Sequence, residues 1–188
     1  MPDPLSVVAL LPGRFQPFHA GHYAAWRALA DAFGEDRAFI GTSDKVELPR
    51  SPLGFAEKRA VMTGLFDVPE AQVVQLRSPY RPAELLERFP SASTALVVAL
   101  SQKDAERLTR GRYYRPWTGQ AAEPFGEAGY VQVVPVAAGG VSGTRVRDLL
   151  ADPDLDEAAR VQGFKELYPR FDPVIYEMLR ARMGDMLR

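Results

Sequence analysis

Short apolar segments alternate with segments of helical periodicity along most of the chain, and this alternation limits the fold more than any other feature. The apolar segments are rich in Val, Leu and Ala at every position, which is typical of strands buried on both faces. Between the first two of them, Tyr23, Trp26, Ala30 and Phe33 recur at helical spacing before Gly34. Strands are predicted at residues 6–11, 37–42, 73–76, 95–100 and 130–136, and further helices at 55–66, 83–89 and 104–109.

The alternation predicts a parallel sheet, because parallel neighbours need crossover connections. Helices then cover both faces, so the expected fold class is α/β, a Rossmann-like doubly wound parallel sheet of about five strands. This domain is expected to span residues 1–151. Residues 152–188 are expected to form a C-terminal helical extension packed on it, broken at Pro169 and Pro173. The segment 111–129 is predicted to be a long loop, a feature that often carries function.

Composition and charge exclude several classes of protein. The 188 residues are 46% hydrophobic and 25% charged, which is typical of a folded globular chain and not of a disordered one. A formal net charge of -1 gives no general attraction for nucleic acid or an anionic membrane, so neither is expected as a partner. The absence of cysteine excludes thiol catalysis and thiolate metal sites. No segment has the pattern of a signal peptide or a membrane span, and we expect a cytoplasmic protein.

Both histidines of the chain, His19 and His22, fall within four residues between the first predicted strand and the first predicted helix. In a doubly wound sheet, ligands bind at the carboxyl ends of the strands, where this loop opens. The N–H groups of a helix N-terminus attract phosphate, and Gly21 lets a triphosphate approach the backbone. Two imidazoles on one side of the first turn can stabilise charge on an attacked phosphorus. Together with the cation of Arg14, the loop therefore predicts a phosphate site.

Two other interpretations of this loop stay open. The histidines can be ordinary residues of a loop and a helix start, one packed and one solvated. Alternatively, two imidazoles can ligate zinc, although the chain has no cysteine and no third ligand is set by spacing. We expect no metal site built from protein side chains.

The longer stretch GRFQPFHAGH, residues 13–22, resembles the nucleotide-binding motif of the nucleotidyltransferase superfamily. Its members carry a His/Thr-x-Gly-His element, and the preceding Gly-Arg-Phe-x-Pro-Phe is especially similar to archaeal-type nicotinamide mononucleotide adenylyltransferases. The resemblance implies catalytic roles for Arg14, His19 and His22. It implies nucleotide contacts for Gly13, Phe15 and Gly21.

A second motif, VSGTRVR at residues 141–147, follows the last predicted strand at the start of a predicted helix. Its hydroxyls, backbone amides and guanidinium groups suit phosphate oxygens, although a helix cap with solvated arginines explains the pattern equally well. The stretch resembles the Ile-Ser-Ser-Thr-x-x-Arg element of the superfamily, with Val141 for Ile and Gly143 for the second Ser. That resemblance implies a catalytic role for Arg147 and nucleotide contacts for Val141, Ser142, Gly143 and Thr144.

Residues that bind the second substrate, the acceptor, are expected at other strand ends. SPLGFAEKRAVM resembles the Asn-Pro-Phe-x-x-x-Glu-Arg helix start of the same adenylyltransferases, with Lys58 in the place of Arg. Aromatic residues in segment 111–129 can stack on a base or pyridine ring, or can pack as anchors in the core. Solvated loops and helix faces account equally well for the charged candidates. The acceptor-binding candidates are Lys45, Lys58, Lys103, Asp104, Tyr114 and Trp117.

The reaction that the resemblance implies is attack by an acceptor phosphate on the α-phosphorus of a nucleoside triphosphate, with pyrophosphate leaving. Mg²⁺ would be bound through the triphosphate. ATP and nicotinamide mononucleotide, which give NAD, are the first-choice substrates. The segment SQKDAERL departs from the Gly-Ser-Ala-Gln type of sequence expected of a nicotinamide mononucleotide enzyme, so another phosphorylated small molecule stays open as the acceptor.

Other functions stay open as well. The nearest is a cytidylyltransferase that uses CTP and a phosphorylated alcohol, followed by a nonenzymatic nucleotide sensor of the same fold. A relative that modifies nucleic acid is disfavoured by a charge near neutrality. The sequence leaves the oligomeric state open, a homo-oligomer included.

Overall fold

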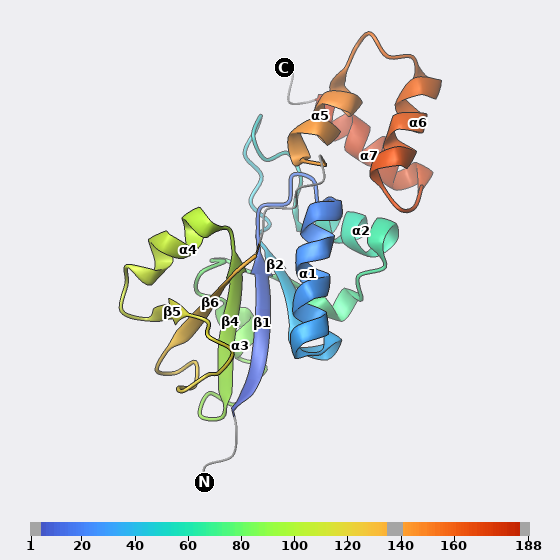
Figure 1. Cartoon of the computed structure of the whole chain (residues 1–188). Coiled ribbons are helices and arrows are strands. Elements are labelled where there is room, and N and C mark those ends of the chain that lie inside the picture. The colour runs from blue at the N-terminus through green and yellow to red at the C-terminus, as the bar shows by residue number, and fades with distance from the viewer. Residues whose placement is uncertain (1–4, 135–140, 185–188) are drawn as a thin grey trace.

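A parallel sheet of six strands forms the centre of the computed structural model, which describes residues 5–134 and 141–184 (Figure 1). The strands are β1 (Ser6–Pro12), β2 (Ala38–Thr42), β3 (Val73–Gln75), β4 (Thr94–Leu100), β5 (Tyr114–Pro116) and β6 (Gly129–Val133). They lie in the order β3-β2-β1-β4-β6-β5, and every neighbouring pair is parallel. The predicted α/β fold class is therefore confirmed.

The sheet has one strand more than the sequence predicts. β5 lies within the segment 111–129, which the sequence analysis assigns to a loop. The strand is three residues long and buries Tyr114 alone, so it has no apolar run that could mark it in the sequence. Its conformation comes from pairing with β6, where Tyr114 lies opposite Gly129.

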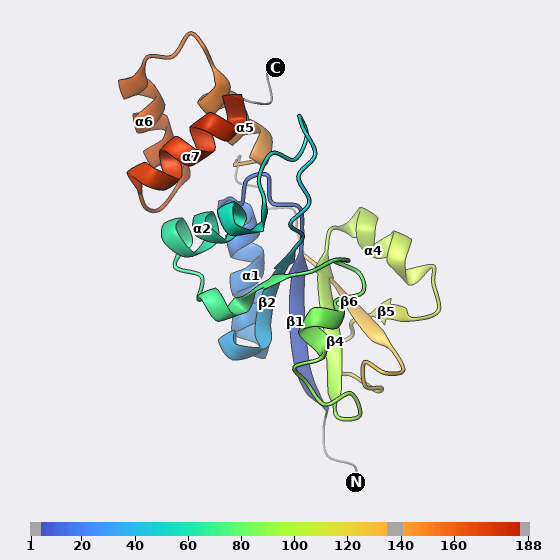
Figure 2. The same ribbon diagram turned by 180° about the vertical axis from the view of Figure 1, so that it is seen from behind.

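Helices cover both faces of the sheet, as Figures 1 and 2 show from opposite sides. They are α1 (Ala20–Phe33), α2 (Phe55–Phe66), α3 (Ala83–Leu86), α4 (Gln102–Thr109), α5 (Gly143–Ala151), α6 (Glu157–Leu167) and α7 (Pro173–Gly184). Short 3-10 helices, η1 (Glu35–Arg37) and η2 (Glu70–Gln72), lead into β2 and β3. α3 is shorter than the predicted 83–89, because the N–H groups of Arg88 and Phe89 donate to carbonyls three residues back, as in tight turns, and not four. The predicted strand 130–136 ends at Val133, and its residues 135 and 136 lie outside the described residues.

Alternate residues of β1 face opposite sides of the sheet. Val8 and Leu10 pack in one apolar cluster with residues of α3 and α4. Ala9 and Leu11 pack in another with residues of α1 and α2. All residues of β2 and β4 are buried, as expected for parallel strands covered on both faces.

The last three helices gather beyond the carboxyl end of the sheet, next to α2 (Figure 1). The apolar face of α7, with Ile175, Leu179 and Met183, is buried in the same cluster as residues of α1 and α2. Among the described residues, no helix is long and apolar enough to cross a membrane. The division into residues 1–151 and a separate extension 152–188 stays a prediction.

The strand order places a topological switch point between β1 and β4. From β1 the chain runs to β2 and β3 on one side, and it then returns to β4 on the other side of β1. Crossover connections leave in opposite directions there, so the carboxyl ends of these two strands border a crevice. A ligand site is expected at this edge.

Candidate active site

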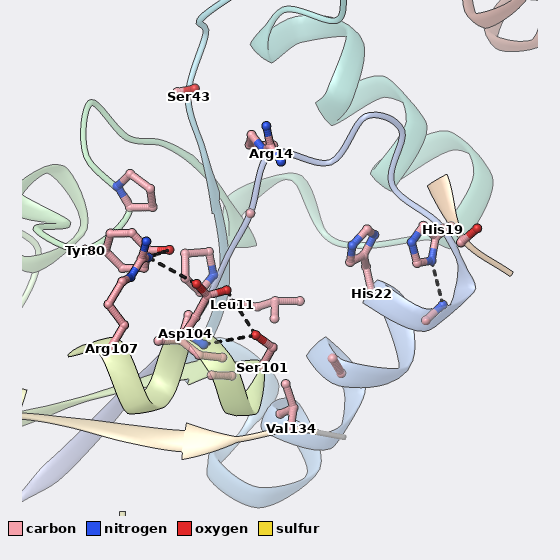
Figure 3. A pocket seen from close by; sticks show the side chains of 18 of the residues that line it. Leu11, Arg14, His19, His22, Ser43, Tyr80, Ser101, Asp104, Arg107 and Val134 are labelled. Atoms are coloured by element: carbon pink, nitrogen blue, oxygen red, sulfur yellow. Dashed lines mark hydrogen bonds and ion pairs between the residues drawn. The ribbon is translucent and has the colours of Figure 1, made fainter. Parts of the chain in front are cut away.

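A cavity of about 800 Å³ opens at the carboxyl edge of the sheet, over the switch point between β1 and β4 (Figure 3). We call it the edge cavity. Its walls come from the segment after β1, the start of α1, the ends of β4 and β6, and the segment before α3. The residues predicted from the sequence that line it are Gly13, Arg14, His19, Gly21, His22, Asp104, Val141 and Ser142.

A smaller cavity of about 490 Å³ adjoins the first, because Arg14, His19 and His22 line both. We call it the arginine cavity, since Arg14, Arg50 and Arg147 contribute to its wall. The predicted residues Phe15, Gly143 and Thr144 line it as well. Guanidinium groups are planar donors that match phosphate oxygens, so this wall suits a polyphosphate. Arg50 could not be predicted as a site residue, because it lies in the exposed segment 44–50, outside either motif.

The two imidazoles lie face to face at the start of α1. Their ring centroids are 3.7 Å apart and their planes are 30° from parallel. His19 is the N-cap residue of α1, and its Nδ1 accepts a hydrogen bond from the Gly21 N–H at 3.2 Å. A neutral imidazole that accepts at Nδ1 carries its proton on Nε2. The His19 side chain can therefore donate from Nε2 to a ligand in the cavity.

Aromatic rings surround the second imidazole. Phe15 meets His22 edge-on with centroids 4.9 Å apart, and the Phe18 ring lies at 5.5 Å. This burial, and to a smaller extent the neighbouring His19, lowers the pKa of His22 to about 3. Burial also lowers the pKa of His19 below its ordinary value. Both imidazoles are thus neutral in the free protein near pH 7, and a bound phosphate would favour their protonated forms.

Phe15 reaches its place under His22 through an unusual backbone conformation. Its φ is +48°, in the left-handed region, and its side chain is buried. A Cβ on Gly13 would lie 2.6 Å from the Phe15 ring, so a side chain at position 13 would displace it. Gly13 therefore lets the loop fold tightly against the aromatic residues that support the histidines.

The second motif meets the first through Arg147. Its Nη1 donates to the Gln16 carbonyl at 2.7 Å, across 131 residues of sequence, and its Nη2 donates to Thr144 Oγ1 at 2.9 Å. Ser142 caps α5 by accepting from the Arg145 N–H at 3.1 Å. A Cβ on Gly143 would lie 3.3 Å from the Gln16 carbonyl oxygen, so glycine in place of the second serine eases this close approach.

Gln16 is a second residue at the site that could not be predicted from the sequence. Its buried side chain forms two hydrogen bonds of 3.0 Å with the backbone of Leu53, one to the carbonyl and one from the N–H. These bonds join the first loop to the segment before α2. The sequence holds no signal for this contact, because the pair is 37 residues apart and outside any periodic pattern.

At the opposite side of the edge cavity, polar side chains pair with one another (Figure 3). Arg107 Nη2 donates to the Tyr80 hydroxyl at 2.9 Å and lies 3.2 Å from Asp104 Oδ1. The Ser101 hydroxyl lies 3.1 Å from Asp104 Oδ2. We call Tyr80, Asp104 and Arg107 the tyrosine end, and Arg14, His19, His22 and Ser142 the histidine end.

A third cavity, of about 770 Å³, adjoins the edge cavity at Tyr80, which lines both. Tyr113, Tyr114, Arg81 and Arg112 contribute to its wall, and we call it the tyrosine cavity. The Tyr114 hydroxyl donates to the Tyr80 carbonyl at 2.9 Å. Burial raises the pKa of Tyr114, so this hydroxyl stays a donor. One of the predicted acceptor residues, Tyr114, thus lies beside the site.

Four predicted acceptor residues do not line any of these three cavities. Lys58 is 1% exposed, and its Nζ donates to the Ser43 carbonyl at 2.7 Å, so it supports the end of β2. Lys45 pairs with Glu47 at 2.6 Å on the surface. Lys103 is exposed on α4.

Trp117 is the fourth predicted acceptor residue that lines none of these cavities. It meets Phe33 and Tyr130 edge-on, with centroids 5.6 Å away in each case, and so packs as a core anchor. The sequence left two alternatives for this residue, stacking on a ligand ring or packing in the core. The structure shows it packed on core residues.

Comparisons with known proteins bear on this site. The model of the cytidylyltransferase-like family matches residues 10–148. Nicotinamide-nucleotide adenylyltransferase 1 of Sulfolobus acidocaldarius is 28% identical over 149 residues, which are 78% of this chain and 79% of that protein.

Two solved structures share the fold. A putative nicotinate-nucleotide adenylyltransferase from Vibrio parahaemolyticus aligns with a TM-score of 0.57 and 15% identity, over 93% of this chain and 99% of that one. A bifunctional NMN adenylyltransferase/ADP ribose pyrophosphatase from Francisella tularensis, complexed with AMP and a manganese ion, aligns with a TM-score of 0.60 and 15% identity. That alignment covers 97% of this chain and 52% of the other. The resemblance seen in the two motifs is confirmed, and the match over residues 10–148 shows that the chain belongs to the cytidylyltransferase-like family.

Proposed function

We propose that the protein is an adenylyltransferase that joins ATP and nicotinamide mononucleotide into NAD and releases pyrophosphate. The observation that carries this proposal is the meeting of the two motifs, where Arg147 donates to the Gln16 carbonyl beside the stacked His19 and His22. The similarity to the Sulfolobus nicotinamide-nucleotide adenylyltransferase supports the choice of substrates.

In this reaction an oxygen of the acceptor phosphate attacks the α-phosphorus of ATP. The bond between that phosphorus and the oxygen bridging to the β-phosphate breaks, and the electron pair leaves with pyrophosphate. No general base is needed, because a phosphate monoester is already ionised near pH 7. His19 Nε2 and the imidazole of His22 would stabilise charge on the transferring phosphate.

The arginine cavity is the proposed place of the β- and γ-phosphates. Arg14 and Arg147 lie in its wall, with the Thr144 hydroxyl held at 2.9 Å from the latter. Because Arg147 is fixed by the Gln16 carbonyl, its charge is in place before the nucleotide binds. Such preorganisation lowers the barrier, since the groups do not have to reorient during the reaction.

Mg²⁺ would enter with the nucleotide and neutralise part of the phosphate charge. The donors at the histidine end are imidazole N–H, hydroxyl, backbone N–H and guanidinium groups, which suit phosphate oxygens and not a cation. Within residues 5–134 and 141–184, no three His, Asp or Glu side chains gather into a metal site. The residues therefore fit an ion held by the triphosphate oxygens.

The tyrosine cavity is the proposed place of the acceptor's pyridine ring. A flat aromatic ring is buried well between tyrosines, and Tyr80, Tyr113 and Tyr114 supply such walls next to the edge cavity. Tyr80 borders both spaces, so an acceptor can extend from this cavity toward the histidines.

Pyrophosphate release tests the proposal. ATP, CTP, GTP and UTP would each be combined with nicotinamide mononucleotide, nicotinic acid mononucleotide and several phosphorylated alcohols in the presence of Mg²⁺. The expected result is release with ATP and nicotinamide mononucleotide, at a rate lower by about a hundredfold or more in a His22→Ala preparation purified in the same way. Release with CTP and an alcohol phosphate would instead assign a cytidylyltransferase. Binding of a triphosphate without release from any pair would assign a nucleotide sensor.

A further inference from the structure

The loop that carries the histidines is held at a second backbone carbonyl, that of Phe18. Its oxygen accepts a hydrogen bond from the Tyr168 hydroxyl at 3.1 Å, across 150 residues of sequence. Phe18 is fully buried and Tyr168 is 4% exposed, so solvent does not compete for this bond. The donor comes from the segment between α6 and α7, beyond the residues that the family model matches.

The carbonyl of Phe18 belongs to the peptide unit that leads into His19. A peptide unit is planar, so a bond that fixes the direction of its C=O also fixes the direction of the next N–H. His19 follows at once, with φ −147° and ψ 174° as the N-cap of α1. The bond from Tyr168 therefore constrains the backbone from which the His19 imidazole projects.

Tyr168 is itself firmly placed. Its N–H donates to the Phe164 carbonyl at 3.1 Å, and its ring stacks on that of Phe164 with centroids 4.5 Å apart. The ring also meets Phe66 edge-on at 5.6 Å, and Phe66 meets Phe18 at 5.3 Å. Burial raises the pKa of Tyr168, so its hydroxyl stays protonated and able to donate.

The helix before Tyr168 is anchored to α5, which starts with the second motif. Arg160 of α6 is buried and donates to the carbonyls of Asp152 at 2.7 Å and Leu155 at 2.6 Å. A Cβ on Gly163 would lie 2.7 Å from the side chain of Leu149, so α6 packs closely on α5. Residues of the packed pair α5 and α6, with the segment after α6, thus hold the first loop at two carbonyls, those of Gln16 and Phe18.

We propose that Tyr168 is a positioning residue, which sets the direction of His19 through the Phe18 carbonyl. This inference rests on the proposed function, because Tyr168 would act through His19, which is proposed to stabilise charge on the transferring phosphate. Arg147 holds the loop at Gln16, and Tyr168 holds it two residues nearer to the histidine.

The variant Tyr168→Phe tests the proposal, because it keeps the stacked ring and removes the donor. We expect kcat to fall about fivefold to tenfold, the loss that corresponds to one hydrogen bond, while KM for ATP changes less than twofold. The matched control is Tyr176→Phe. Tyr176 is also buried, meets Phe164 at 5.2 Å and loses a hydroxyl contact, but its partner is Glu157. This control should lower the melting temperature similarly and keep kcat within twofold.

A second measurement reports on the loop without turnover. Because the chain has two histidines, proton NMR shows two imidazole Cε1–H resonances, and the spectrum of the single variant His19→Ala assigns both. Tyr168→Phe should shift the His19 resonance, and Tyr176→Phe should not.

The proposal is overturned if Tyr168→Phe keeps kcat within twofold, if both variants lose kcat equally, or if kcat falls while the His19 resonance stays unchanged. If the wild-type protein releases no pyrophosphate from any pair, the proposed function fails. In that case the shift of the His19 resonance in Tyr168→Phe still tests whether Tyr168 positions His19.

Discussion

The two ends of the edge cavity are built in different ways. At the histidine end, His22 Nδ1 is buried without a hydrogen-bond partner in the described part of the chain, and His19 bonds to backbone next to it. At the tyrosine end, Arg107 is paired with both Tyr80 and Asp104. The histidine end thus has a polar atom without a partner among the described residues, whereas the polar side chains of the tyrosine end bond to one another. In the proposed reaction, the histidine end would stabilise charge on the transferring phosphate, while the tyrosine end would shape the place of the acceptor.

The largest effect is expected at the histidine end. His22→Ala should lower kcat by about 10²–10⁴-fold, because a group that stabilises the attacked phosphate is removed. Pyrophosphate release would measure the loss, and circular dichroism would show that the fold is kept. A His22→Ala protein with near-normal turnover would contradict the role assigned to this end.

The burial of His22 also predicts how stability depends on pH. The pKa of His22 is about 3 in the folded chain, against an ordinary value of 6.5. Between these values the unfolded chain binds a proton that the folded chain does not, so the stabilising contribution is present above pH 6.5 and is lost as the pH falls. The free energy of unfolding should fall by about 2 kcal/mol between pH 7 and pH 5 from this group.

Urea unfolding of the wild type and of His22→Ala at pH 7 and pH 5 would measure the contribution of His22 to the free energy of unfolding. The variant should show a weaker dependence over this interval. Equal dependence in both proteins would show that His22 titrates alike in the folded and unfolded chains.

A smaller effect is expected at the tyrosine end. Tyr80→Ala should raise KM for the acceptor about tenfold and leave KM for ATP within twofold, because it removes an aromatic wall from the tyrosine cavity. Tyr80→Phe keeps the ring and loses only the hydrogen bond from Arg107, and serves as the control. If ATP binding suffers more than acceptor binding, the two ends hold the substrates in the opposite order.

The smallest effect is expected for predicted residues that the fold places elsewhere. Lys103→Ala should change neither KM by more than twofold, because Lys103 lines none of the three cavities. Initial rates at varied acceptor concentration would check this. A marked rise in acceptor KM would mean that the acceptor reaches along α4 beyond the tyrosine end.

The histidine end could be predicted from the sequence because its chemistry is local. A glycine, a helix start and two imidazoles lie within four residues, and phosphate binding at a helix N-terminus needs little more. The alternation of strands and helices likewise predicted the doubly wound sheet, because it depends on periodicity alone.

The tyrosine end could be predicted only at Asp104, which follows a predicted strand. Tyr80 and Arg107 are brought together by the fold from positions 27 residues apart, and neither belongs to a motif. Lys58 shows the converse case: the resemblance of its segment to a family motif predicted an acceptor contact, and its side chain is buried under the end of β2. β5 was missed because its pairing with β6, and not its own sequence, makes it a strand.

The bond from Tyr168 to Phe18 has a consequence for the order of events during synthesis. It joins residues 150 positions apart, so the donor is synthesised long after the carbonyl that accepts from it. A ribosome delivers both histidines early, before the residue that donates to the Phe18 carbonyl exists. The nascent chain would therefore gain this last support of the nucleotide loop only once residue 168 has emerged and docked.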